Sequence, residues 1–342
     1  MRPMPIALDR RSILLAAFLL SLGVPVLAQT ISAPKRIGLL INGGPKGPGE
    51  LIRRDFVQDL ARLGYAEDRD IRLDPRFAEG VLSRLPVLAG ELVQSNPDVI
   101  IGFGGPAVQA AAQATSTVPI VFSIVTDPVA LGLVASLDKP GRNVTGVTSL
   151  DPEQAAKQTE LLTAVFPEIR RVAILSDTTI PGADVNGMAP IDRANLAAAN
   201  ALGLQAQVVK VKGPAAERPD PDFASAFAAM KAEHAEAVIV LELPVAFAHR
   251  RRIADEARAH RIPTMFPGGM RDAGGVITYG TSVADTWRRL PAIVDKILKG
   301  TNPAEIPVEF VTRRELVFNL KAASEIGVAI PEALLAQAEV VR

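Results

Sequence analysis

Glycine-rich turns stand directly after two short apolar runs of the sequence. Asn42-Gly43-Gly44 follows the run 37–41, and Gly104-Gly105-Pro106 follows the run 99–103. Glycine lets a backbone approach a ligand closely, and a helix starting there offers unpaired N–H groups to an anion such as a carboxylate. The same glycines suit tight strand-to-helix turns, and both interpretations stay open. Neither turn matches a phosphate loop or a dinucleotide fingerprint, so nucleotide chemistry is not supported.

Carboxylates and hydroxyls stand at corresponding places elsewhere in the chain. Asp127 either accepts hydrogen bonds from a ligand or caps the turn that follows it. Glu242 is either a ligand contact or a solvated loop carboxylate. Asp127 and Asp177 have the chemistry for acid–base work, but aspartates after strands are equally ordinary in binding sites. The remaining candidates for ligand contact are Ser123, Thr126, Ser149, Thr178, Thr179, Pro244, Phe247 and Gly268.

The inventory of reactive side chains argues against an enzyme. The chain has no cysteine, which removes disulfides, thiolate catalysis and cysteine-ligated metals. Its three histidines, His234, His249 and His260, fall in expected helices among charged neighbours. They have neither metal-ligand spacing nor a nucleophile motif, so we expect them at the surface. We therefore expect no catalytic residue, no metal site and no cofactor.

The elements that carry the candidate residues alternate between short apolar runs and longer amphipathic segments. The runs 37–41, 99–103, 120–125, 172–175 and 237–241 are apolar on both faces, as strands buried between helical layers must be. This alternation predicts α/β architecture with doubly wound parallel sheets. In such sheets ligands bind beyond the carboxyl ends of the strands, where the candidate residues lie.

Two Rossmann-like lobes are expected, because single domains seldom exceed about 250 to 300 residues. The first should cover about 35–148 and about 271–308, and the second about 151–270 and about 309–342. Such a return makes a multi-strand hinge between the lobes. Trp287, the only tryptophan, lies on an apolar helical stripe and should pack in a core. A second stripe comprises Ile52, Phe56, Leu60 and Leu63.

The N-terminus has the pattern of an export signal over residues 1–28. Arg10-Arg11 precedes the apolar run 13–22, and small residues before Ala28 suit a signal peptidase. The paired arginines fit either the general secretory or the twin-arginine route. The balance of 37 basic and 37 acidic residues argues against nucleic-acid binding. We expect a periplasmic, monomeric mature chain without membrane insertion.

Residues spread from Lys35 to Val340 resemble the bacterial ABC-transporter substrate-binding proteins of the tryptophan and tyrosine type. The densest matches are 118–122, 127–134 and 140–146, and the others are 36–38, 63–65, 78–80, 84–86, 273–275, 279–280, 297–300, 303–304 and 316–321. The resemblance implies a type I periplasmic-binding fold with three hinge crossings and a cleft that closes on its ligand. It implies contact loops around Gly44, Gly105, Asp127, Ser149, Asp177 and Glu242. The connection 178–194 departs from the family pattern, and it either lines the cleft or lies outside it.

The expected function is therefore solute binding for an ABC transporter. The cargo would be a small polar or carboxylate-bearing metabolite, for example an amino acid, delivered to a membrane permease. Few aromatic residues lie near the expected cleft, so an aromatic cargo is not assumed. Two alternatives stay open: a ligand-sensing receptor for a membrane signalling partner, and an exported α/β enzyme.

Overall fold

Two β-sheets organise the described part of this computed structural model. It describes residues 33–45, 48–149, 153–178, 180, 183–212 and 221–342, with the backbone alone at 48–53. Residues Pro34–Arg342 belong to one compact unit. The expected signal peptide lies outside the described residues.

The first sheet has six strands in the order β11-β5-β4-β3-β1-β2, and all neighbours are parallel. The strands are β1 (Lys35–Ile41), β2 (Ile71–Phe77), β3 (Val99–Phe103), β4 (Ile120–Val125), β5 (Val144–Thr148) and β11 (Glu309–Phe310). The central strands β3 and β4 are buried on both faces, as their apolar runs predict. β2 lies at the sheet edge, where Pro75 removes no ladder hydrogen bond from a second neighbour.

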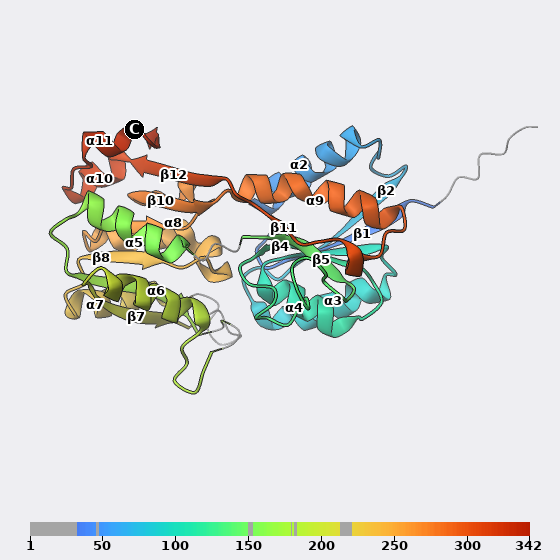
Figure 1. Ribbon diagram of the computed structural model, residues 1–342, viewed down its shortest axis with the longest axis horizontal. Coiled ribbons are helices and arrows are strands. Elements are labelled where there is room, and N and C mark those ends of the chain that lie inside the picture. The colour runs from blue at the N-terminus through green and yellow to red at the C-terminus, as the bar shows by residue number, and fades with distance from the viewer. Residues whose placement is uncertain (1–32, 46–47, 150–152, 179, 181–182, 213–220) are drawn as a thin grey trace, which may run out of the picture. The chain divides into compact units, whose positions relative to one another are not determined.

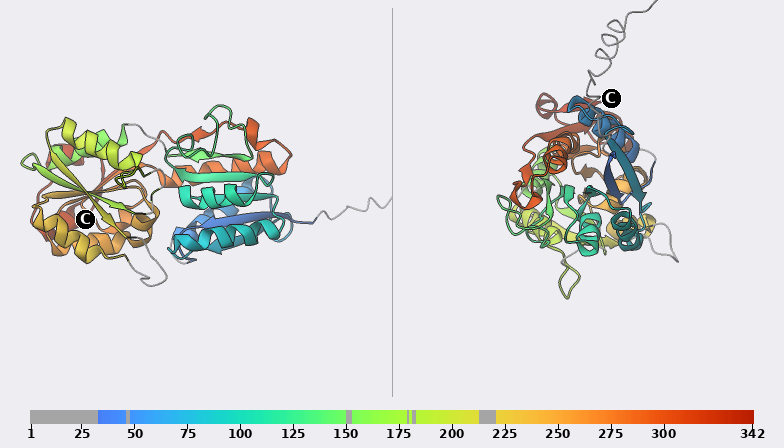
Figure 2. Two further views of the ribbon diagram at one scale, coloured as in Figure 1. Left: turned by 90° about the horizontal axis from the view of Figure 1, so that it is seen from below. Right: turned by 90° about the vertical axis from the view of Figure 1, so that its right-hand side faces the viewer.

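Helices cover both faces of the first sheet (Figure 2). The helix α2 (Pro48–Arg62) packs with α9 (Val283–Leu298), and α3 (Leu85–Gln94) packs with α4 (Gly105–Ala114). Trp287 packs against the core beneath α9, as expected. The expectation that Leu63 belongs to the apolar stripe of α2 is wrong. The helix ends at Arg62, and the Leu63 side chain is 44% exposed.

The second sheet has seven strands in the order β13-β12-β10-β9-β8-β6-β7, and only the pair β10 and β12 is antiparallel (Figure 1). Its strands are β6 (Arg171–Asp177), β7 (Gln205–Val211), β8 (Ala237–Val240), β9 (Thr264–Phe266), β10 (Ile277–Thr281), β12 (Arg314–Asn319) and β13 (Glu339–Val341). The remaining helices are α5 (Gln154–Val165), α6 (Pro190–Ala201), α7 (Phe223–Ala232), α8 (Pro244–Ala259), α10 (Leu320–Ile326) and α11 (Glu332–Leu335), with short 3₁₀ helices at Leu82–Arg84, Arg271–Ala273 and Pro303–Glu305.

The chain passes between the two sheets three times, between β5 and α5, between β10 and α9, and between β11 and β12. These are the three crossings that the resemblance implied. The expected boundaries at 271 and 309 need correction, because β10 joins the second sheet and β11 joins the first. Each of these strands pairs before the chain crosses, so each crossing comes one strand later than expected.

Candidate functional site

Hydrogen bonds connect the carboxyl ends of β1, β3 and β4 in the first sheet. Asn42 Nδ2 donates a hydrogen bond to the Phe103 carbonyl at 2.8 Å, and Gly104 N donates to the Ser123 carbonyl at 2.9 Å. Gly104 has φ +85°, a conformation that favours glycine, and an added Cβ would lie 2.8 Å from Asn42 Nδ2. The tight-turn interpretation of Gly104 is therefore confirmed, and the residues after β1, β3 and β4 meet at one edge. Gly43, Gly44, Gly105 and Pro106 lie beside them, all partly buried.

Three buried oxygens at this edge have no hydrogen-bond partner in the described part of the chain. They are Asn42 Oδ1, Ser123 Oγ and Ser149 Oγ, and the two serines are only 0% and 3% exposed. Buried polar groups in folded proteins are nearly always paired, because desolvating one without a partner costs about 1–3 kcal/mol. These oxygens therefore have unused capacity to bind a polar solute.

One helix at the strand ends of each sheet begins without a side-chain cap. Gly104 is the N-cap of α4 and Leu243 that of α8, and neither accepts a hydrogen bond through its side chain. A helix N-terminus carries a partial positive charge and orphan N–H groups. A Cβ added to Gly104 would lie 3.9 Å from Pro244 Cγ, so the two helix starts approach each other.

Asp127 caps a turn after β4. Its Oδ1 accepts a hydrogen bond from Ala130 N at 2.9 Å, so the capping role that the sequence left open is observed. Thr126 is partly buried beside it, and its carbonyl accepts from Thr148 Oγ1 at 3.3 Å. Direct ligand contact by Thr126 or Asp127 stays a prediction.

Carboxylates stand at the corresponding edge of the second sheet. The register pairs Leu175 of β6 with Val240 of β8, so Asp177 and Glu242 follow on neighbouring strands. Asp177 is 1% exposed, and Glu242 is partly buried. Gln154 Nε2, at the start of α5, lies 3.5 Å from Glu242 Oε2. The sequence signalled this helix start but did not single out Gln154.

The turn after β9 brings Gly268 near Phe247, and Thr178 lies after β6. Gly268 follows β9, where an added Cβ would lie 2.2 Å from the Thr281 carbonyl, so close backbone approach requires glycine. The Phe247 ring lies beside this turn, 3.5 Å from a Cβ added at Gly269. Thr178 is exposed, and its N–H donates to the Val211 carbonyl at 3.1 Å. Thr179 lies outside the described residues.

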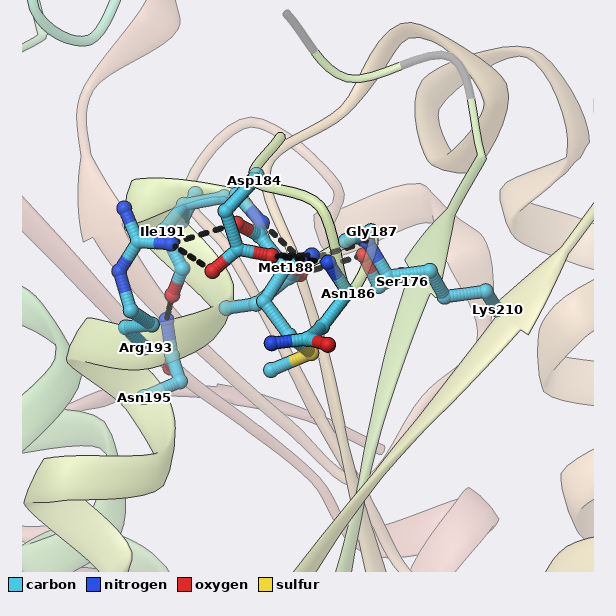
Figure 3. A network of polar contacts seen from close by, with 11 residues as sticks. Ser176, Asp184, Asn186, Gly187, Met188, Ile191, Arg193, Asn195 and Lys210 are labelled. Atoms are coloured by element: carbon cyan, nitrogen blue, oxygen red, sulfur yellow. Dashed lines mark hydrogen bonds and ion pairs between the residues drawn. The ribbon is translucent and has the colours of Figure 1, made fainter. Parts of the chain in front are cut away.

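A polar network around Asp184 holds residues 184–193 of the connection 178–194 (Figure 3). Asp184 Oδ1 accepts from Asn186 N and Met188 N, both at 2.9 Å, and its Oδ2 accepts from Arg193 at 2.9 Å. The hydrogen bond from the Met188 backbone, with those from Asn186 and Arg193, holds the pKa of Asp184 below its usual range. The segment from Asp184 to Met188 is thus a closed loop.

A buried ion pair connects this loop to the ends of β6 and β7. Asp192, 0% exposed, lies 2.6 Å from Lys210 Nζ, and Lys210 also donates to the Gly187 carbonyl. Asp192 further accepts from Ser176 Oγ at 2.6 Å and from Ala189 N at 2.8 Å. Sequence reasoning missed Asp192 and Lys210 because β7 was not among the predicted strands.

The histidines differ from the expectation of three surface side chains on helices. His234 is exposed but lies beyond the end of α7, with φ +58°. His249 and His260 are partly buried, with ring centroids 5.6 Å and 6.1 Å from Phe223 and Phe227. The aromatic neighbours explain this burial.

The described side chains include no group of three or more histidines or acids placed to hold a metal ion. Within the described ranges, each helix is too short or too polar to cross a membrane.

Comparison with known proteins places this arrangement in a family. The "Tyrosine-binding protein" of Clostridioides difficile is 31% identical over 140 residues, which are 41% of this chain and 39% of that relative. The match therefore spans less than half of the relative's length. An ABC domain from Streptococcus pneumoniae in complex with L-Trp is 27% identical, with a TM-score of 0.78 over 90% of this chain and 100% of that one.

A more distant structure shares the fold. The leucine binding protein LivK of Thermotoga maritima is 16% identical, with a TM-score of 0.54 over 79% of this chain and 77% of that one. It is a periplasmic binding protein of type I, the fold class that the sequence predicted. The sequence model of the family described as ABC transporter substrate binding protein matches residues 47–342. This chain therefore belongs to the ABC transporter substrate binding protein family.

Proposed function

We propose that this chain is the solute-binding component of an ABC transporter. It captures a small polar or carboxylate-bearing metabolite, for example an amino acid, in a cleft between its two lobes. The observation that carries the proposal is a set of three buried oxygens at one sheet edge that have no hydrogen-bond partner among the described residues: Asn42 Oδ1, Ser123 Oγ and Ser149 Oγ. The named cargoes of two relatives, tyrosine and L-Trp, support an amino acid.

The carboxylate of such a solute suits the start of α4. Gly104 gives that helix no side-chain cap, and Gly105 lets a solute approach the backbone closely. The hydroxyls of Ser123 and Ser149 are donors to the same anionic group. A helix dipole and two hydroxyls together favour an anion over a cation at this end of the solute.

The ammonium of an amino acid suits the other sheet. Asp177 and Glu242 place two carboxylates on neighbouring strand ends, where a positive charge is attracted. A zwitterion would thus be oriented with its carboxylate toward the first sheet and its ammonium toward the second. Lobe closure around it would change the surface that the chain presents to a membrane permease.

The setting follows from the family and from the N-terminal sequence. Residues 1–28 would direct export, and the mature chain would act in the periplasm as a monomer that delivers its solute to the permease. The chain would hold its solute reversibly and release it unchanged, without catalysis.

Thermal-shift measurements on residues 29–342 with L-amino acids and small carboxylates test the proposal. A ligand that binds only the folded state raises the melting temperature. At a ligand concentration of 100 times the Kd, it adds about 2.7 kcal/mol to the free energy of unfolding. Ser123→Ala should weaken the best ligand about tenfold, since a hydrogen bond to a charged group contributes about 1.5–3 kcal/mol. Ser116→Ala, at an exposed serine before β4, is the matched control and should leave the Kd unchanged.

Two results would contradict the proposal. The first is a panel in which no compound shifts the wild-type melting temperature. The second is chemical conversion of a compound by the purified chain, which would favour an enzyme.

A further inference from the structure

The strand β4 contains a bulge at Ile124. Along the pairing with β5, Ser123 aligns with Val147 and Val125 aligns with Thr148, so Ile124 is an extra residue without a partner. Its φ is +56°. A β-branched residue in the left-handed region is a genuine outlier, and such strain persists only where the surroundings enforce it.

The bulge changes which side chains face the core. Ile120, Phe122 and Val125 belong to one buried cluster, while Val121 belongs to the cluster on the opposite face. Regular alternation would have placed Ile124 with Ile120 and Phe122. Ile124 instead belongs to neither cluster and is partly buried. The bulge therefore withdraws a large aliphatic side chain from the core at the carboxyl end of a central strand.

Contacts from β5 and the residue after it hold the backbone that follows Ile124. Thr148 Oγ1 donates to the Val125 carbonyl at 2.7 Å, and Ser149 N donates to the same carbonyl at 3.3 Å. Ile124 thus lies between Ser123 and Val125, whose carbonyl accepts the hydrogen bond from Ser149 N. Two buried hydroxyls without partners in the described part of the chain accompany the one strained aliphatic residue of this strand.

We propose that Ile124 is a specificity-determining contact of the solute site. Its side chain forms an apolar wall for the hydrocarbon part of a solute whose polar end binds the hydroxyls of Ser123 and Ser149. The solute is then amphiphilic, such as an amino acid with an aliphatic or aromatic side chain, and glycine or a sugar is disfavoured. This inference rests on the proposed function.

The variant Ile124→Gly separates ligand contact from structural support. Glycine adopts positive φ readily, so the variant relieves backbone strain while it removes the whole side chain. The melting temperature of the free protein should therefore stay level or rise. The Kd for the tightest-binding hydrophobic amino acid should rise about tenfold, the lower range for lost methylene contacts in an apolar pocket. Removing a residue that only packed in the core would lower the melting temperature instead.

Arg261→Gly is the matched control, because Arg261 is an exposed residue with φ +52° just before β9, at the amino end of its sheet. It should leave the Kd unchanged. Isothermal titration with L-leucine, L-tryptophan, L-tyrosine and glycine gives the constants. If Ile124→Gly fails to fold, Ile124→Val replaces it, with an expected rise in Kd of about fourfold.

The outcomes separate this inference from the proposed function. If the wild type binds a hydrophobic amino acid and the Kd of Ile124→Gly stays within twofold, the inference is overturned and solute binding stands. Preference of the wild type for glycine overturns it as well. If none of the four amino acids binds the wild type, the role of Ile124 is refuted together with amino-acid capture.

Discussion

The buried pair of Asp192 and Lys210 should be the main electrostatic support of the loop from Asp184 to Met188, and Lys210→Met tests this directly. At 2.6 Å and an effective dielectric constant of about 20, the gross attraction is about 6 kcal/mol, before the cost of desolvating both ions. Removing one partner of a buried pair typically costs about 3–5 kcal/mol, because the other charge stays buried. Hydrogen bonds from Ser176 and Ala189 still reach Asp192 in the variant. We therefore expect the lower end, about 3 kcal/mol.

Thermal unfolding measures this loss. For a domain of 150–250 residues, 1 kcal/mol corresponds to about 2–4 °C, so the melting temperature of Lys210→Met should fall by at least about 6 °C. The double variant Lys210→Met/Asp192→Asn removes the uncompensated charge and should recover much of the loss. Lys157→Met is the control, because Lys157 pairs with Glu160 on an exposed surface and such pairs contribute about 0–1 kcal/mol.

Two results would refute this reasoning. A Lys210→Met variant that melts within about 1 °C of the wild type would show that the pair adds nothing beyond the hydrogen bonds of Asp192. A double variant no more stable than the single one would show that the loss comes from the lysine's packing rather than from the unpaired carboxylate.

Two further predictions concern pH. Hydrogen bonds from Arg250 hold the pKa of Asp272 below its usual range. The ionised carboxylate therefore stabilises the fold fully above its unfolded pKa of about 3.9. This stabilisation is lost as the pH falls through the lower pKa of the folded state. Melting curves between pH 6 and 2 should show a shallower acid slope for Asp272→Asn, by at most about 1 kcal/mol because Asp272 is 44% exposed. Burial and the hydrogen bond to Asp295 raise the pKa of Tyr65 to about 12. Its contribution to the free energy of unfolding is therefore complete below its unfolded pKa of about 10. That contribution is lost as the pH rises toward 12. Tyr65→Phe should cost about 1 kcal/mol at pH 7 and flatten the alkaline slope, and an unchanged slope would contradict this assignment.

The central strands were predictable from the sequence because their burial is complete. Val99–Phe103 and Ile120–Val125 coincide with their predicted runs, since strands covered on both faces need apolar residues at every position. The edge strands β2 and β7 were not predicted. One face of each is less covered, so charged and polar residues such as Asp74 and Lys210 interrupt the apolar pattern.

Part of the candidate site was also predictable, because parallel topology alone brings strand ends to one edge. Asn42, Gly104 and Ser123 meet as that rule requires. The cap formed by Asp127 depends on local geometry, which the residue type permits but does not decide. Asp192 and Lys210 were beyond reach, because their pairing requires the end of β7 to lie beside the start of α6.

Ile124 shows why a regular pattern can conceal a functional position. The six residues of β4 are nearly all apolar, and their periodicity gives no sign that one of them lies outside the alternation. At the bulge, Thr148 and Ser149 hold the Val125 carbonyl from the neighbouring strand and the turn after it. Local preference disfavours Ile124 at φ +56°, so tertiary contacts must outweigh its strain. Natural sequences break a local rule mainly where function or strain requires it. The bulge and the positive φ of Ile124, which no sequence rule predicts, are therefore the strongest reason to test Ile124 as a ligand contact.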